Sequence, residues 1–296
     1  MLAQLAFALI NGLSAGMALF LVAAGLTLIF GILRILNFAH GSFFMIGAYI
    51  AFSLLRRFDL GLPGFIGAGL VAGFVVGLIG ILIDKLILQR LRHLDEAYML
   101  IATFGLLMVC QGAVQLIWGG DFHSITAPDA LSGAVMIGPV AVPVYSLFLI
   151  CVGACVFLAL DVCIHRLWIG KVIQALAADR WMTGLLGVDA PLLFSGVVVA
   201  AFMLAGLAGG LMLPNQALSP DLGNAYTLQA FIAVVIGGPG NVRGAFLAAL
   251  LLGLIESFSS ILLPNAPGLA IFAAMIAALL WRPDGLLQRG TLQWRV

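Results

Sequence analysis

Three polar side chains interrupt an apolar stretch near the N-terminus, in the sequence GILRILNFAHGSFFMIGAY at positions 31–49. Arg34, Asn37 and His40 follow one another at intervals of three, so they lie within about one face of a helix. Two interpretations stay open. Asn37 is suited to cap a helix start and His40 to bond a neighbouring carbonyl, or both line a substrate path near the cytoplasmic mouth, because ionisable groups at membrane depth are often functional.

A second polar group lies in the apolar segment 97–120, where Thr103, Gln111 and Gln115 occur together. Gln111 and Gln115 are neighbours on one helix face, and Gly112 beside them leaves room for another helix or a ligand. Hydrogen bonding between helices is the simpler interpretation. Contact of Thr103 and Gln111 with a substrate is the alternative.

The third candidate is Glu256, a carboxylate in the sequence LLGLIESFSSILL. A lone acid in a membrane must face protein or water and must be paired or protonated. Coupling of transport to protons or cations would need such a group, but no second acid and no Lys or Arg stands at comparable depth. We therefore place Glu256 on the substrate path as a hypothesis, without assigning ion coupling.

Catalytic and metal-binding patterns are missing from the sequence. The histidines are scattered, the four cysteines lack metal-ligand spacing, and no nucleophile and base are suitably placed. The phosphate-binding pattern G-x-x-x-x-G-K-[ST] does not occur. We predict no enzyme activity, no metal site and no directly bound cofactor.

Composition indicates what must position these residues. Hydrophobic residues make up 64% of the 296 and charged residues only 8%, against about 25% charged in soluble domains. The apolar runs are continuous and about 20 residues long, which is the pattern of membrane helices. The 36 glycines favour close helix packing. A net charge of +1 predicts no nucleic-acid partner.

The apolar runs predict an all-α, polytopic membrane protein with eight or nine transmembrane or partly spanning helices. They fall at about 5–30, 38–55, 62–83, 97–117, 143–164, 192–213, 226–237, 245–263 and 267–281. Eight are long enough to span, whereas 226–237 is short and ends in the helix-breaking GGPGNVRG at 237–244.

The charge distribution predicts the orientation. With the N-terminus outside, eleven of the thirteen Lys and Arg residues fall inside and only Arg56 and Arg57 outside. The C-terminus is then cytoplasmic. The first apolar run is too long for the core of a cleaved signal peptide.

Two connecting segments are longer than the rest. The outside segment 118–144 is rich in Gly and Pro and is expected to fold over the outer face. The inside segment, at about 165–190, has helical spacing in its middle, bounded by Gly170 at one side and Gly184 and Gly187 at the other. We expect a short amphipathic cytoplasmic helix here, within a single transmembrane domain over 1–296.

Six motifs in order resemble the H-type permease subunits of branched-chain amino-acid ABC importers. They are GLTLIFGILRILNFAHGSFFMIGAY (25–49), LIATFGL (100–106), GKVIQALAADRWMTGLLGVD (170–189), SPDLG (219–223), AVVIGGPGNVRGAFLAALLLGLIE (233–256) and WRPDGLL (281–287). The resemblance implies a sister permease forming a heterodimer, two cytoplasmic ATPases that use the ATP, a periplasmic solute-binding protein and a location in the bacterial inner membrane.

The resemblance also assigns docking of the ATPases to the segment 170–187. The residues concerned are Gly170, Lys171, Ala177, Asp179, Arg180, Gly184 and Gly187. Small residues would let the segment lie against an ATPase, and the charged ones would orient it. Related permeases carry urea, short amides or aromatic acids, so the cargo stays open between these and branched-chain amino acids. The alternative function is a stand-alone secondary transporter or channel.

Overall fold

The structure is a computed structural model that describes residues 2–33, 37–58, 61–92, 95–138, 140–262, 268–282 and 285–287. Arg34, His93, Arg289 and Arg295 lie outside these residues. All nine predicted apolar runs coincide with helices.

The helices and strands follow one another in a simple order. They are α1 (Leu2–Leu33), α2 (His40–Arg57), α3 (Gly61–Ile83), the π-helix η1 (Asp84–Leu88), α4 (Gln89–Leu91), α5 (Glu96–Trp118), the 3-10 helix η2 (Asp129–Leu131), β1 (Ala134–Ile137), β2 (Val140–Pro143), α6 (Val144–His165), α7 (Trp168–Ala178), α8 (Arg180–Leu185), α9 (Ala190–Leu211), the 3-10 helix η3 (Leu213–Asn215), α10 (Leu222–Gly237), α11 (Val242–Leu262) and α12 (Leu269–Trp281).

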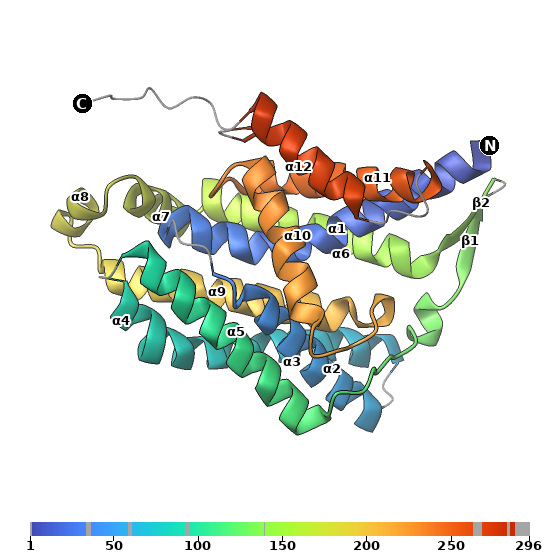
Figure 1. Ribbon diagram of the computed structural model, residues 1–296, viewed down its shortest axis with the longest axis horizontal. Helices are drawn as coiled ribbons and strands as arrows, with labels where there is room; N and C mark the ends of the chain where they lie inside the picture. Colours follow the sequence, from blue (N-terminus) through green and yellow to red (C-terminus); the bar gives the residue numbers. More distant parts are fainter. Residues whose placement is uncertain are drawn as a thin grey trace.

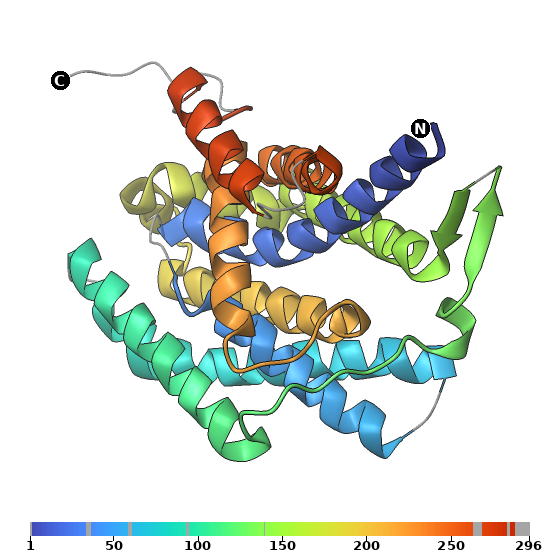
Figure 2. The same cartoon turned by 45° about the vertical axis from the view of Figure 1, so that its right-hand side comes forward.

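The protein is mostly helical, and six helices of the described chain are long and apolar enough to cross a membrane. They are α1, α3 with its continuation through α4, α5, α6, α9 and α11. Helices α10 and α12 have 16 and 13 residues, which at about 1.5 Å per residue is shorter than about 30 Å of hydrocarbon. Helix α10 runs across the long helices rather than along them (Figures 1 and 2).

The all-α prediction is wrong in one detail, because the segment 118–144 contains an antiparallel hairpin. Strands β1 and β2 pair from Ala134–Pro143 to Ile137–Val140. The β-branched residues Val135, Val140 and Val142 favour extended structure, and Gly138 turns the chain with φ = 61°. The hairpin and the start of α1 lie at one end of the bundle, here called the hairpin end (Figure 1).

The opposite end carries α7 and α8, here called the α8 end (Figure 1). Asp179 accepts a hydrogen bond from the backbone N–H of Met182 (2.9 Å) and so caps α8. Asp189 caps α9 in the same way through Leu192 (3.1 Å). The predicted amphipathic helix of the 165–190 segment is therefore two helices, with the break at Asp179.

Glycines allow the long helices to pack backbone against backbone. A Cβ added to Gly31 would lie 2.7 Å from the Cα of Gly240, and one added to Gly47 would overlap the backbone of Gly206. Without water there is little hydrophobic drive between membrane helices, so such close contact supplies much of the packing energy. The core thus forms around α1, α2, α9 and α11.

Candidate functional site

A polar cavity of about 520 Å³ opens between five elements near the hairpin end. Its walls come from α1, the start of α6, η3, α10 and α11. The polar residues that line it are Asn11, Tyr145, Ser146, Asn215, Gln216, Tyr226, Gln229, Glu256, Ser257 and Ser260. A polar cavity among apolar helices is costly to form without a function, so it is the strongest candidate for a solute site.

Part of this lining is held by the protein itself. The hydroxyl of Tyr145 donates to the carbonyl of Leu211, and the amide of Gln216 donates to the hydroxyl of Tyr226. Ser257 donates to the carbonyl of Ala8 over 2.8 Å. These bonds tie α6 to the end of α9, α10 to the segment after η3, and α11 to the start of α1, and they fix the shape of the cavity.

Other lining groups remain available to a ligand. Glu256 is half-buried and forms no ion pair or hydrogen bond through its carboxylate within the described part of the chain. Asn11 and Gln229 contribute amides from α1 and α10. Among the described lining residues there is one acid and no Lys, Arg or His. The cavity can therefore accept a cationic or amine group at Glu256 and bind neutral polar groups around it.

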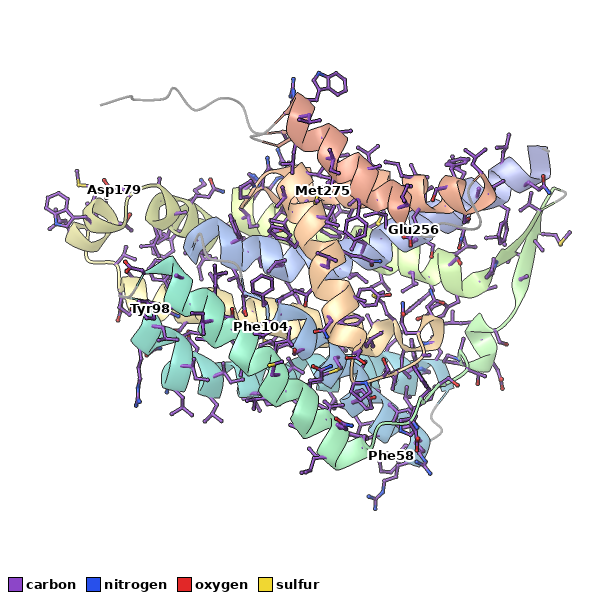
Figure 3. The ribbon with its side chains drawn as sticks, in the orientation of Figure 1. Phe58, Tyr98, Phe104, Asp179, Glu256 and Met275 are labelled. Atoms are coloured by element: carbon purple, nitrogen blue, oxygen red, sulfur yellow. The ribbon has the colours of Figure 1, made fainter. Side chains whose placement is uncertain are left out.

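Glu256 is the one predicted path residue that lines this cavity. Figure 3 shows it on α11, far along the bundle from Asp179. Asn37, His40, Thr103 and Gln111 do not line this cavity. Their roles on the substrate path stay predictions.

Asn37 and His40 form a buried joint between α1 and α2. The side chain of Asn37 accepts a hydrogen bond from the backbone N–H of Ala39 over 3.1 Å, which shapes the turn before α2. His40 is 0% exposed, and its Nε2 lies 3.0 Å from the carbonyl oxygen of Val22. The next residue, Gly41, donates its N–H to Thr227 of α10 (3.1 Å). The joint thus connects three helices.

Thr103 and Gln111 both lie on α5 but in different surroundings. Thr103 is buried and donates to the carbonyl of Leu100 in its own helix over 3.1 Å. Gln111 donates its amide to the carboxylate of Asp221, immediately before α10. This is a hydrogen bond between elements, as the simpler interpretation expected for Gln111.

The predicted docking residues are distributed along α7 and α8. Gly170 is buried, and a Cβ there would overlap the carbonyls of Cys163 and Ile164, so it serves the turn from α6. Lys171 and Gly184 are exposed. Gly187 ends the segment with φ = 82°.

The remaining members of that set are Ala177, Asp179 and Arg180. Ala177 is half-buried on α7, and Asp179 is exposed while capping α8. Arg180 begins α8, but its side chain lies outside the described part. The docking role of these seven residues stays a prediction.

Sequence reasoning missed two ion pairs, one between two helices and one within the continuous helix from α3 to α4. Arg243, at the start of α11, forms two bonds with Asp161 of α6, at 2.5 and 2.9 Å. Arg92 pairs with Asp84 of η1, which is only 1% exposed. The sequence does show Asp84 and Asp161 as acids at the ends of apolar runs. Which arginine each acid pairs with depends on the folded structure.

Most of the polar cavity was missed for the same reason. Asn11, Gln216 and Gln229 are separated by long stretches of sequence, and only the fold brings them to Glu256. Each is an ordinary neutral residue within its own segment of sequence.

The family described as "Branched-chain amino acid transport system / permease component" matches residues 8–280. No solved structure is significantly similar to this chain.

Curated relatives cover nearly its full length. The chain is 32% identical to the high-affinity branched-chain amino acid transport system permease protein BraD of Pseudomonas aeruginosa, over 95% of both chains. It is 28% identical to LivH, the permease of the same description in Escherichia coli, over 94% of both. The ribose import permease RbsC of Escherichia coli is 26% identical over 65% of this chain and 59% of its own.

The relatives are transport permeases and not enzymes, which agrees with the sequence-based prediction. The helices long enough to span a membrane fit the same conclusion. This multi-pass membrane protein is a transport permease subunit and belongs to the branched-chain amino acid transport system permease family.

Proposed function

We propose that the chain is one of two permease subunits in an ATP-driven importer, with ATPases docked on α7 and α8. The observation that carries this proposal is the surface of α8 and the turn after it. Trp181, Leu185 and Leu186 are 73%, 64% and 79% exposed there. Figure 3 shows that α8, marked by Asp179, projects from the bundle. A large exposed apolar patch at the end of a membrane protein fits a partner surface.

The distribution of charges supports an orientation with the α8 end in the cytoplasm. Arg56 and Arg57 are in the last turn of α2. The cationic residues on the segments that meet at the other end are Lys85, Arg90, Arg92, Arg166, Lys171 and Arg243. Short loops rich in Lys and Arg stay in the cytoplasm. The N-terminus is then outside and the C-terminus inside, in a bacterial inner membrane, with α2, α10 and α12 as shorter or partly spanning helices beside the six long ones.

The sister permease is proposed to cover α5. This helix packs on α2 and leaves its other side bare, with Ile101, Val109 and Leu116 between 68% and 88% exposed. Gly105 and Gly112 lie on the same helix with no atom near their missing Cβ positions. Two glycines seven residues apart share a helix face and allow another helix to approach closely.

The cargo is proposed to be a branched-chain amino acid, delivered to the hairpin end by a soluble binding protein. BraD and LivH are named for such transport, and the polar cavity offers Glu256 to an ammonium group and amides to a carboxylate. Relatives include a ribose permease, so the fold alone does not select the cargo. ATP is bound and hydrolysed by the partner ATPases and not by this chain.

The test is the double variant Trp181→Ser with Leu185→Ser, made in the complete complex. We expect the ATPases to be lost during co-purification and ATP-dependent leucine uptake into vesicles to fall to background. The control is Phe122→Ser, which removes an equally exposed side chain (77%) in the segment between α5 and η2 and should retain the ATPases.

Retention of both ATPases by the double variant would contradict docking on α8. Leucine uptake that continues in vesicles without ATP would instead support a stand-alone transporter.

A further inference from the structure

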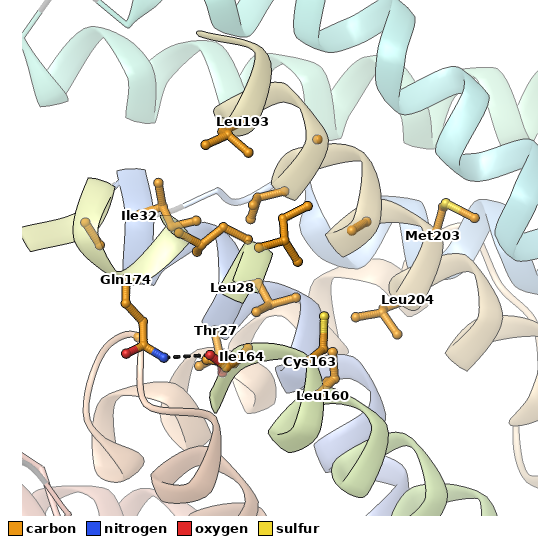
Figure 4. Close-up of a pocket in the computed structure, with 18 of the residues that line it drawn as sticks. Thr27, Leu28, Ile32, Leu160, Cys163, Ile164, Gln174, Leu193, Met203 and Leu204 are labelled. Atoms are coloured by element: carbon orange, nitrogen blue, oxygen red, sulfur yellow. Dashed lines mark hydrogen bonds between the residues drawn. The ribbon is translucent and has the colours of Figure 1, made fainter. Parts of the chain in front are cut away.

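A second cavity, apolar and larger than the first, lies between α1, α3, α6, α7 and α9. Its volume is about 770 Å³, and Figure 4 shows hydrocarbon side chains such as Leu28, Ile32 and Leu204 around it. Several of its lining residues are also open to the surroundings, Leu70, Phe74 and Leu192 being 58%, 56% and 69% exposed. The cavity is therefore a groove on the surface of the bundle, here called the apolar groove.

Membrane-spanning helices make four of the five walls, so the apolar groove opens to lipid hydrocarbon. Its few polar groups are already used. Thr27 donates to the carbonyl of Ala23 over 2.7 Å, and the amide nitrogen of Gln174 donates to the carbonyl of Ile164 over 2.8 Å (Figure 4). No charged side chain occurs among the described residues that line it. An alkyl chain matches these walls, whereas a polar solute would lose its hydration without compensation.

The segments at the α8 end carry cations that form no ion pair with the described acids. Lys85, Arg90, Arg166 and Lys171 form no ion pair within the described residues.

Most acids of the same region are engaged by other groups, whereas Asp95 before α5 is exposed and makes no side-chain cap hydrogen bond. Asp84 and Asp161 pair with arginines, and Asp179 and Asp189 accept from backbone N–H groups. Unpaired cations beside a groove between membrane helices favour an anionic lipid headgroup.

We propose that the apolar groove binds an acyl chain of an anionic phospholipid, with its headgroup among the cations of the α8 end. Helix α7 forms one wall through Ile169, Ile173 and Ala177. The acyl chain then fills the space between α7 and α9 and supports α7, the helix that leads into α8. This inference requires only that the protein spans a membrane, and it holds for any cargo.

Gly196 of α9 provides a direct test, because it lines the apolar groove and has no atom within 4 Å of its missing Cβ. The variant Gly196→Phe places a ring in the groove without a backbone clash. The matched control is Gly67→Phe on α3, where the missing Cβ also meets no atom but which does not line the groove. Gly196→Ala is the mild variant.

The measurement is native mass spectrometry of the complete complex after extraction from membranes that contain phosphatidylglycerol and phosphatidylethanolamine. We expect retained phosphatidylglycerol in the wild type, Gly67→Phe and Gly196→Ala, and its loss in Gly196→Phe with an unchanged melting temperature. If Gly196→Phe does not assemble, Gly196→Leu is measured in its place with the same expected loss.

Equal retention of phosphatidylglycerol by the wild type and the groove-filling variant would overturn the proposal. Efficient disulfide formation, under an added oxidant, between Gly196→Cys and a cysteine introduced into the sister permease would also overturn it, because protein would then cover the groove. Neither result bears on docking of the ATPases, so this proposal fails independently of the proposed function.

Discussion

Glu256 and His40 are both ionisable residues in apolar segments, but the protein treats them differently. His40 is fully buried, and its Nε2 has a hydrogen-bond partner in the carbonyl of Val22. A Cβ on Gly25 would lie 2.8 Å from the His40 ring, which shows how closely α1 encloses it. Glu256 lines an open polar cavity, and its carboxylate forms no ion pair or hydrogen bond with the described residues. Packing thus favours a structural role for His40 and a ligand-facing role for Glu256.

Replacing Glu256 with Gln should reduce leucine uptake about tenfold. A hydrogen bond to a charged group is worth about 1.5–3 kcal/mol and a neutral one about 1 kcal/mol, and a difference near 1.4 kcal/mol is about tenfold. The measurement is the uptake rate into vesicles at saturating binding protein.

Glu256→Asp keeps the charge on a shorter side chain and should recover part of the uptake. Assembly of the complex should be unchanged in both variants, since the carboxylate bonds to nothing in the described structure. Full uptake by Glu256→Gln would remove Glu256 from the substrate path.

At the scale of elements, α2 and α9 are held together by glycine contacts. A Cβ added to Gly47 would lie 2.4 Å from the backbone of Gly206, and one added to Gly206 would lie 2.7 Å from Val76 of α3, so neither position has room for a side chain. Phe43 of α2 and Phe202 of α9 stack beside them with ring centres 3.8 Å apart. The separation of the two helices is therefore fixed by their backbones.

Gly47→Ala should destabilise the protein, because the added methyl must push α9 away. Overpacking of this kind costs about 1–3 kcal/mol. Gly67→Ala is the control, since the missing Cβ of Gly67 meets no atom, and alanine there favours the helix by up to about 1 kcal/mol. Thermal melting in detergent should show a lower midpoint for Gly47→Ala alone; equal midpoints would contradict the close contact.

Element positions followed from the sequence more readily than the site did. Nine apolar runs gave nine helices, because continuous hydrocarbon must satisfy its backbone internally within a membrane. The start of α10 was placed too late, at 226 rather than Leu222, because Gly223 and Asn224 look like loop residues. Gly223 is in fact where α10 meets Gly41 of α2, so tertiary contact outweighs its low helix propensity.

The polar cavity shows what such patterns cannot supply. Glu256 stood out because it is a charge, but Asn11 and Gln229 are neutral residues on helices that meet only in the folded bundle. The hairpin was missed because its valines are spread between glycines and prolines. The helical period over 170–187 continues through Asp179, so the sequence pattern does not reveal that this residue caps a new helix.

At the scale of the whole molecule, the ion pair Arg243–Asp161 links the α8 end to the helix that lines the polar cavity. Asp161 lies one turn before the end of α6, from which α7 and α8 follow, and His165 lies beside it at 3.1 Å. Arg243 starts α11, whose other end carries Glu256. The pair therefore joins the docking segment to the helix that lines the polar cavity.

Asp161→Asn should lower leucine uptake severalfold while ATP hydrolysis continues. The arginine is about half exposed, so water screens the pair, its contribution to stability is small, and folding should be retained. The reversed pair Asp161→Arg with Arg243→Asp should restore uptake. Uptake and hydrolysis falling in the same proportion, or no rescue by the reversed pair, would contradict a connecting role.

The glycine contacts have a mechanical consequence. A contact made by side chains can shift by rotation about a bond, but backbone against backbone, as at Gly31 and Gly240, has no such adjustment. Helices joined in this way move as a rigid body. Opening and closing of the transport path would then occur by rocking of this rigid body against its neighbours. The glycine-rich interior would transmit the motion from one membrane face to the other.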